Sequence, residues 1–265
     1  MNSNLLDLIL FSDKRKDFLM LLKEGPKNIE EILEKLQESR TALLPQIKRL
    51  KEDNLVIHEG EMYRLSSIGE IVVGKMQPLL DTLEVFEKDP RFWADRKLAP
   101  IPANLKKRIN ELRTYRLIEP ELSHTFDINP EFVKHLSNSS CIHLFLSYFH
   151  PQFPAFFLSL ARNGTQISLN LSEAVYLRFE EDFKKEGEKF LNMDNTDLFI
   201  LDKKGMDIPA AIISTDRIMI LGLFTESGKF DSQYVISSDR KAIKWGEDLF
   251  RYYRDMSREI KAKER

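Results

Sequence analysis

The sequence contains almost no cysteine: among its 265 residues, Cys141 is the single one. One thiol excludes an intramolecular disulfide framework, a metal site built from a cysteine cluster, and redox sensing by paired cysteines within one chain. Cys141 opens the apolar segment Cys-Ile-His-Leu-Phe-Leu, which is typical of a buried strand. We therefore expect a buried and unreactive thiol.

The sequence also lacks a long hydrophobic run and a strong excess of charge. No segment is apolar for long enough to cross a bilayer, and the start has no basic segment of the kind that opens a signal peptide. The net charge is −2 and the pI is about 6.3. We therefore expect a cytoplasmic protein without a membrane partner, long enough for two modest domains.

Catalytic sequence motifs are absent as well. The ten glycines are spread thinly, and no phosphate loop, Gly-x-Gly-x-x-Gly, Gly-x-Ser-x-Gly or His-Glu-x-x-His occurs. His143 and His150 flank one apolar run, and an unbroken strand would place them on opposite faces. We therefore expect no catalytic residue, no cofactor and no metal site, and a protein that is not an enzyme.

The residues between 28 and 67 predict a winged helix-turn-helix, because a helix, a short turn, a second helix and a hairpin follow in that order. Apolar residues recur at helical spacing in the first helix, at Ile29, Ile32, Leu33 and Leu36. The second helix has its own apolar arc, formed by Leu43, Ile47, Leu50 and Asn54. Both arcs are expected to pack inward, and DNA reading is the first functional hypothesis.

The outward face of the second helix is basic, since no acid occurs between Arg40 and Lys51. We expect Thr41 to be the N-cap, which would place Pro45 in the first turn, where amides have no intrahelical partner. Such a helix is expected to enter the major groove of double-stranded promoter DNA. The candidate DNA contacts of the helix and hairpin are Arg40, Thr41, Gln46, Lys48, Arg49, Lys51, His58 and Arg64.

A short hairpin follows, with period-two segments on either side of Glu59-Gly60-Glu61. Its end, Tyr63-Arg64-Leu65-Ser66-Ser67-Ile68-Gly69, resembles the Tyr-x-Leu-Thr-x-x-Gly that closes the wing in many ArsR-like and MarR-like regulators, with Ser66 in place of threonine. Winged folds also serve as protein-interaction modules, and residues 1–75 hold about as many acids as bases. An interaction module without specific DNA binding therefore stays open as the alternative.

The second half predicts an α/β domain. Pro90, Pro100 and Pro102 prevent residues 87–104 from forming one helix, so we expect a connector and then a helix over residues 87–125. From Cys141 onward, apolar strand-like segments alternate with helical ones. The whole chain is thus an N-terminal α+β winged helix-turn-helix (1–86) joined to a C-terminal α/β domain (126–265) with a mixed, partly parallel sheet.

Ligands of open α/β sheets bind at the carboxyl ends of the strands. Tyr148 and His150 follow the apolar run that begins at Cys141, and Asn170 lies near the end of the next strand. Asp216 precedes a further apolar run, although an Asp-Arg pair there is also typical of a hairpin turn. We take these four residues as candidates for ligand contact; a structural turn before Pro151 is the alternative for His150.

The second half resembles the archaeal methanogenesis-regulator family through four passages in order. They are Trp93 with Pro100-Ile101-Pro102; Tyr148-Phe149-His150-Pro151 with Leu160-Ala161-Arg162-Asn163-Gly164; Thr215-Asp216-Arg217; and Ala242-Ile243-Lys244-Trp245-Gly246-Glu247-Asp248-Leu249-Phe250. The resemblance implies a cytoplasmic archaeal transcription regulator, a homodimer whose C-terminal domain senses a small molecule or a protein. Its sensory fold is similar to that of sugar-sensing regulators related to phospholipase D, whose His-x-Lys signature is absent here. An enzyme on the α/β half is therefore the least favoured alternative.

Overall fold

The computed structural model describes residues 4–120 and 128–261. It divides the chain into two units, Met1–Asp81 and Thr82–Arg265, and the division falls within helix α5 (Ser67–Lys88). The boundary expected near residue 125 lies outside the described residues. The residues expected to form a separate connector belong to the second unit instead, because their apolar side chains are part of its core.

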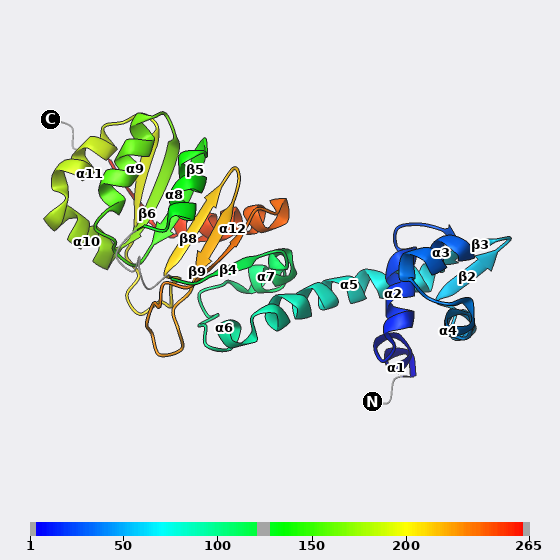
Figure 1. Cartoon of the computed structure of the whole chain (residues 1–265). Coiled ribbons are helices and arrows are strands. Elements are labelled where there is room, and N and C mark those ends of the chain that lie inside the picture. The colour runs from blue at the N-terminus through cyan, green and yellow to red at the C-terminus, as the bar shows by residue number, and fades with distance from the viewer. Residues whose placement is uncertain (1–3, 121–127, 262–265) are drawn as a thin grey trace. The chain divides into compact units, whose positions relative to one another are not determined.

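The first unit, blue to cyan in Figure 1, is a winged helix-turn-helix. Its helices before α5 are α1 (Asn4–Leu10), α2 (Asp13–Leu22), α3 (Ile29–Leu36) and α4 (Arg40–Glu52). Its strands are β1 (Lys27–Asn28), β2 (Val56–Glu59) and β3 (Met62–Leu65), which form an antiparallel sheet in the order β1-β3-β2. The predicted winged fold is therefore confirmed.

The predicted apolar arc of α4 is buried up to Leu50 and differs at its last member. Leu43, Ile47 and Leu50 are at most 2% exposed, as their helical spacing predicts. Asn54 is exposed, because α4 ends at Glu52 and Asn54 has a φ of 58° in the left-handed region. The helix ends before it could bring Asn54 onto the buried face.

Helix α4 begins earlier than predicted. Ser39, rather than Thr41, is the N-cap, and its hydroxyl accepts a hydrogen bond from the amide of Ala42 at 3.3 Å. Pro45 therefore lies inside the helix, beyond the first turn. Because proline has no N–H, the carbonyl of Thr41 receives no helical hydrogen bond from residue 45.

Ser66 joins the end of α4, the wing and the start of α5. Its backbone amide donates to the carbonyl of Leu55 at 3.0 Å, and its hydroxyl donates to the carbonyl of Asn54 at 2.5 Å. The same hydroxyl accepts from the amide of Gly69 at 2.9 Å, which caps the first turn of α5. These bonds give a physical reason for a hydroxyl residue and a glycine three positions apart at the end of the wing.

The second unit contains one mixed sheet, as predicted. Its strand order is β11-β7-β6-β5-β8-β9-β10-β4; β5, β6 and β7 run parallel and the other neighbours pair antiparallel. The strands are β4 (Arg116–Ile118), β5 (Cys141–Leu146), β6 (Gln166–Ser172), β7 (Thr196–Leu201), β8 (Ala211–Thr215), β9 (Met219–Gly222), β10 (Tyr234–Ser237) and β11 (Arg258–Ile260).

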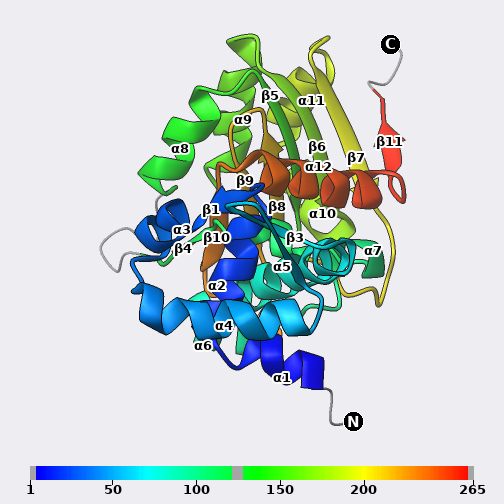
Figure 2. The same cartoon turned by 90° about the vertical axis from the view of Figure 1, so that its right-hand side faces the viewer.

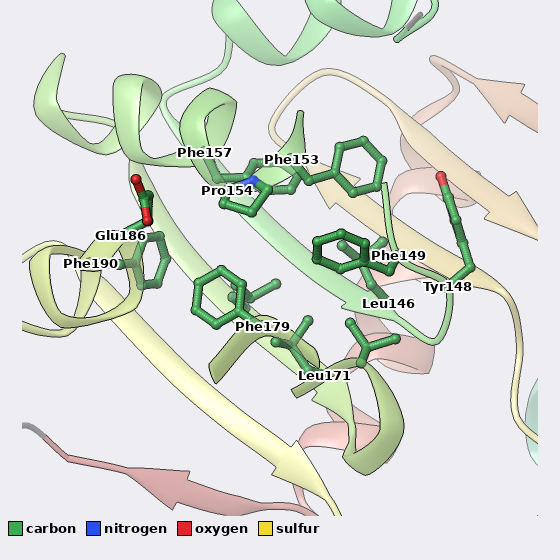
Figure 3. A pocket seen from close by; sticks show the side chains of 12 residues that line it. Leu146, Tyr148, Phe149, Phe153, Pro154, Phe157, Leu171, Phe179, Glu186 and Phe190 are labelled. Atoms are coloured by element: carbon green, nitrogen blue, oxygen red, sulfur yellow. The ribbon is translucent and has the colours of Figure 1, made fainter. Parts of the chain in front are cut away.

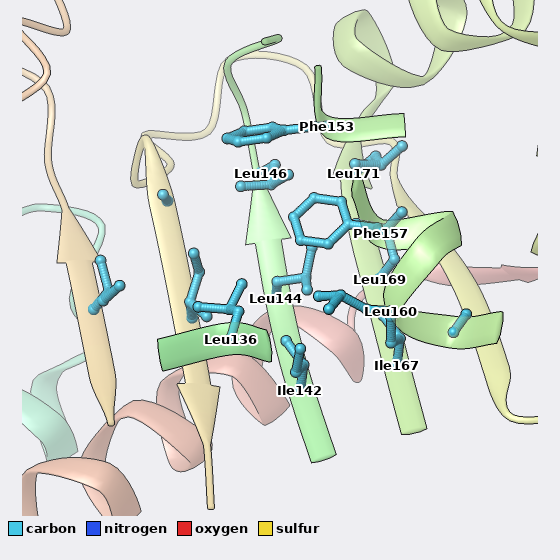
Figure 4. Packing of buried hydrophobic residues seen from close by; sticks show 14 of the residues in the cluster. Leu136, Ile142, Leu144, Leu146, Phe153, Phe157, Leu160, Ile167, Leu169 and Leu171 are labelled. Carbon is cyan, nitrogen blue, oxygen red and sulfur yellow. The ribbon is translucent and has the colours of Figure 1, made fainter. Parts of the chain in front are cut away.

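Helices cover both faces of this sheet, so it has two buried layers. One face carries α8 (Pro130–Ser137), α9 (Phe153–Arg162), α10 (Glu173–Asp182) and α11 (Lys184–Leu191) (Figure 1). On this face, Leu136 and Leu160 from the helices pack near Leu144 and Leu169 of the central strands (Figure 4). Phe183 separates α10 from α11.

The other face is covered by α12 (Arg240–Arg254), which lies across the strands in Figure 2. The short helices α6 (Pro90–Ala94), α7 (Ala103–Lys106) and η1 (Ile109–Leu112) share its apolar layer. The helix expected to follow the connector within residues 87–125 is therefore wrong as one continuous helix, since Leu117 lies in β4 and pairs with Val235. No helix among the described residues is long and apolar enough to cross a membrane.

The close approach at Gly69 predicts a strong effect of a methyl group. A Cβ at Gly69 would lie 2.1 Å from the carbonyl oxygen of Leu55, which is backbone and cannot rotate away. We expect Gly69→Ala to lower the free energy of unfolding of the winged unit by about 2–3 kcal/mol or more. The measurement is urea unfolding of the full chain.

Gly74→Ala is the matched control, because Gly74 lies in the same helix and a Cβ there meets no atom within 4 Å. Its expected effect is neutral to stabilising, by about 0.5–1 kcal/mol. Equal stability changes in the two variants would contradict the packing described for Gly69.

Candidate functional site

The outer face of α4 presents positive charge that no nearby acid neutralises well. Lys48, Arg49 and Lys51 are exposed, and Thr41 lies on the same side of the helix. Arg49 and Lys51 form no ion pair with any residue that the structure describes, and Lys48 lies 3.8 Å from Glu52. Arg49 and Lys51 can therefore attract phosphate without first losing an ion pair.

Two further cations of the first unit are paired with acids. Arg40 Nη2 contacts Glu30, and Lys14 Nζ lies 2.7 Å from Glu38. These pairs are at the surface, so each contributes little to stability, but each offsets the charge of its cation. Arg40 is consequently a weaker candidate for DNA contact than Arg49, since it would have to leave Glu30.

The wing is acidic at its tip. Gly60 has a φ of 60°, and the two-residue turn that it begins is flanked by Glu59 and contains Glu61. Arg64 donates to both carboxylate oxygens of Glu59, at 2.8 and 3.2 Å, and holds the pKa of that carboxyl below its usual value. His58 is exposed and stacks on Tyr63 with ring centroids 4.1 Å apart. A phosphate that approaches this tip meets carboxylates, so α4 is the more favourable contact.

Gln46, taken from the sequence as a DNA contact, is engaged inside the unit. Its side-chain oxygen accepts from Nη1 of Arg15 at 2.6 Å, and Arg15 is only 8% exposed. The Nε of Arg15 donates to the carbonyl of Leu8. Gln46 therefore ties α4 to α2 and α1, a role that no local pattern indicated because the two residues are 31 positions apart.

Helix α5 exposes an apolar face within the first unit. Ile68, Ile71 and Leu79 are 54, 68 and 47% exposed, and Val72 is half-buried beside them in the helix. Phe11, which follows α1, is 79% exposed. Contiguous exposed apolar side chains are typical of an interaction surface.

An apolar pocket lies at the carboxyl ends of β5 and β6, and its cavity has a volume of about 30 Å³. Aromatic side chains converge on it from the β5–α9 connection and from α9, α10 and α11 (Figure 3). Its lining residues are Leu146, Tyr148, Phe149, Phe153, Pro154, Phe157, Leu169, Leu171, Val175, Phe179, Glu186 and Phe190. Burial raises the pKa of the Tyr148 hydroxyl well above its usual value, so the phenol stays protonated. The run of phenylalanines from Phe149 to Phe157 was the sequence signal for this lining.

The four residues taken as ligand contacts do not converge. Tyr148 lines the pocket, and the ring of His150 packs at a tilt against Phe153, with ring centroids 5.0 Å apart. Asn170 faces away from the pocket, because strand alternation points it opposite to Leu169 and Leu171, and it accepts from Ser257 at 3.1 Å.

Asp216 lies at the opposite end of the sheet. It follows β8, which runs antiparallel to β5, so the turn falls beside the start of β5. There the Asp216 carboxylate accepts from the hydroxyl of Ser140 at 2.8 Å and from its amide at 3.3 Å. Within the described ranges, no group of three or more His, Cys, Asp or Glu side chains is placed to hold a metal ion.

Each of the two units matches a model of a known protein family. The family model for the N-terminal domain of the methanogenesis regulatory protein FilR1 matches residues 5–84, and the model for its middle domain matches residues 125–256. The methanogenesis regulatory protein FilR1 of Methanothrix harundinacea (strain 6Ac) is 24% identical over 251 residues. That match covers 94% of this chain and 56% of the relative, so the chain spans little more than half of the relative's length.

Two solved structures are similar over large parts of their chains. TrmBL2, described as an archaeal chromatin protein with a novel mode of DNA binding, is 12% identical with a TM-score of 0.43 and covers 97% of both chains. Nuc, a phospholipase D family member from Salmonella typhimurium, is 9% identical with a TM-score of 0.41 and covers 56% of this chain and 97% of its own.

The contact between Gln46 and Arg15 predicts a loss of stability on substitution. Gln46→Ala removes the acceptor of a nearly buried guanidinium, so we expect the free energy of unfolding to fall by about 1–3 kcal/mol. Gln46→Glu keeps an acceptor at that place and is expected to retain most of the stability. Thermal unfolding of both variants checks this; a Gln46→Ala variant as stable as the parent would contradict the structural role of Gln46.

Proposed function

Because this chain belongs to the archaeal methanogenesis-regulator family represented by FilR1, we propose that it binds specific promoter DNA and regulates transcription. The observation that carries the proposal is the positive charge of Arg49 and Lys51 on the exposed face of α4, where neither side chain forms an ion pair with a described residue. In a winged helix-turn-helix this second helix is the element that enters the major groove. The name of the relative assigns methanogenesis regulation to that protein.

In the proposed complex, the exposed face of α4 lies against the DNA. Arg49 reads a base edge, while Lys48 and Lys51 contact phosphates, and Thr41 lies near the helix start. The acidic wing tip stays away from the backbone, with His58 as the residue of the hairpin best able to contact DNA. Arg40 and Arg64 have secondary roles, since both are held by glutamates.

Substitution of the α4 cations tests this complex. We expect Arg49→Ala to weaken specific binding by about 1–3 kcal/mol, or roughly 5- to 150-fold, because a base-edge contact is lost. Lys51→Ala should weaken binding to specific and scrambled duplexes alike and reduce the salt slope by about 1, because it removes a phosphate contact. Fluorescence anisotropy over a salt series measures both effects.

Lys189→Ala is the control, since Lys189 is an exposed lysine of α11 in the second unit and its loss changes the charge by the same amount. Binding unchanged by Arg49→Ala and Lys51→Ala would contradict the docking of α4.

We also propose a homodimer in which a second copy covers the apolar face of α5. Ile71→Asp should shift the chain to the monomer, because a buried carboxylate in the interface is costly while the side chain is exposed in the single chain. Light scattering after size exclusion measures the mass. Leu177→Asp, at a leucine of α10 that is 60% exposed, is the control and should leave the mass unchanged. A wild-type monomer at micromolar concentration would refute the dimer.

In this proposal the second unit senses a small molecule or a partner protein and has no catalytic role, and the protein acts in the cytoplasm. Sensing requires that the ligand bind two states unequally, since equal affinity shifts no population. Helix α5 is the element through which a change could pass, because it begins directly after the wing and ends in the second unit.

A protein-interaction module is the second candidate function. The balanced charge of the first unit and its acidic wing tip favour it. A partner bound without DNA, with an affinity insensitive to salt, would support that function over promoter binding.

A further inference from the structure

A second pocket lies in the second unit where α5 ends. Its volume is about 520 Å³, within the usual range of small-molecule sites, and its lining is largely polar. The lining comes from the end of α5, from α6 and the residues after it, from the region of β4, and from the segment before β10. Lys88, Arg91, Phe92, Arg96, Asp231 and Gln233 are the residues on which the inference rests.

Arg96 is the unusual residue of this pocket, because its side chain is only 2% exposed. Its Nη2 donates to Asp231 at 2.6 Å and to the side-chain oxygen of Gln233, and its guanidinium carbon lies 4.4 Å from the centre of the Phe92 ring. Its other two nitrogens, Nε and Nη1, are buried without a hydrogen-bond partner among the described residues.

Buried donors of a charged group are almost always paired, because an unpaired donor loses its hydrogen bonds to water and gains nothing in return. Asp231 offsets the charge of Arg96 but bonds a single nitrogen of the guanidinium. What is missing is therefore a further acceptor, and an oxyanion is the strongest acceptor for a guanidinium.

The other charged side chains of the pocket restrict the chemistry of the ligand further. Lys88, which donates to the backbone carbonyl of Tyr115, and exposed Arg91 add positive charge. Asp89, Asp95 and Glu119 also line the pocket, so the body of a ligand meets acceptors as well as donors. A molecule with one anionic group and several hydroxyl or ammonium donors satisfies both kinds of lining.

We propose that this pocket binds a small polar metabolite whose carboxylate or phosphate group accepts hydrogen bonds from Arg96. The inference deepens the proposed sensing role and rests on it for its biological meaning. Lys88 is the last residue of α5, so a ligand here touches the helix that begins directly after the wing. The apolar pocket at the carboxyl ends of β5 and β6 offers no comparable donor and far less room.

The test uses the full chain without DNA, so that its failure is distinguishable from a failure of promoter binding. Inorganic phosphate and acetate are titrated separately at constant ionic strength, with chloride as the reference, and thermal unfolding is followed. We expect a saturable rise in Tm of about 2–4 °C for at least one anion, at a concentration about tenfold above its Kd. Phosphate alone would indicate a phosphorylated ligand, and acetate alone would indicate a carboxylate.

Arg96→Lys should abolish the rise, because lysine keeps a positive charge opposite Asp231 but lacks the guanidinium donors. Arg178→Lys, at an arginine of α10 paired with Asp182 at 3.4 Å outside the pocket, should keep it. No stabilisation by either anion would overturn the proposal, and so would a rise that persists in Arg96→Lys.

A second measurement tests the proposal even if the Arg96→Lys variant does not fold. A crystal structure of the wild-type chain grown with the stabilising anion should place that anion within hydrogen-bond distance of Arg96 Nε or Nη1. A water molecule in that place, with no anion in the pocket, would overturn the proposal.

Discussion

The winged unit depends on the bonds of one serine. Ser66 holds the carbonyls of Asn54 and Leu55, just beyond α4, with its hydroxyl and its amide, and the same hydroxyl caps the first turn of α5. Because Gly69 has no Cβ, the first turn of α5 packs directly against the Leu55 carbonyl at the start of the wing. The orientation of α4 relative to the wing and to the start of α5 is thereby set by a few backbone contacts.

Charge placement then distinguishes the faces of that unit. Ion pairs offset the charges of Arg40, Lys14 and Arg64, whereas Arg49 and Lys51 have no ion-pair partner in the part of the chain that the structure describes. A domain with nearly balanced total charge can therefore still present a local basic surface. The tip of the wing is acidic, so the basic surface is confined to α4. This favours DNA contact through the helix over contact through the hairpin.

Local patterns in the sequence predicted the elements whose causes are local. The helical spacing of Leu43, Ile47 and Leu50 and the turn at Gly60 depend on residues a few positions apart, and both are found in the structure. The start of α4 was misplaced by two residues, because Ser39 and Thr41 are both good N-caps and only the helix geometry chooses between them.

Features that depend on distant residues were beyond sequence reasoning. Gln46 contacts Arg15 across 31 positions, and Arg96 contacts Asp231 across 135, so no spacing pattern reveals either contact.

The central claim is that α4 docks specific DNA. The most direct test is a salt titration of binding to the DNA fragment upstream of the chain's own gene, with a scrambled duplex as competitor. The account predicts preference for the upstream fragment and a steep fall of affinity with salt; equally weak binding to both duplexes at every salt concentration would contradict it.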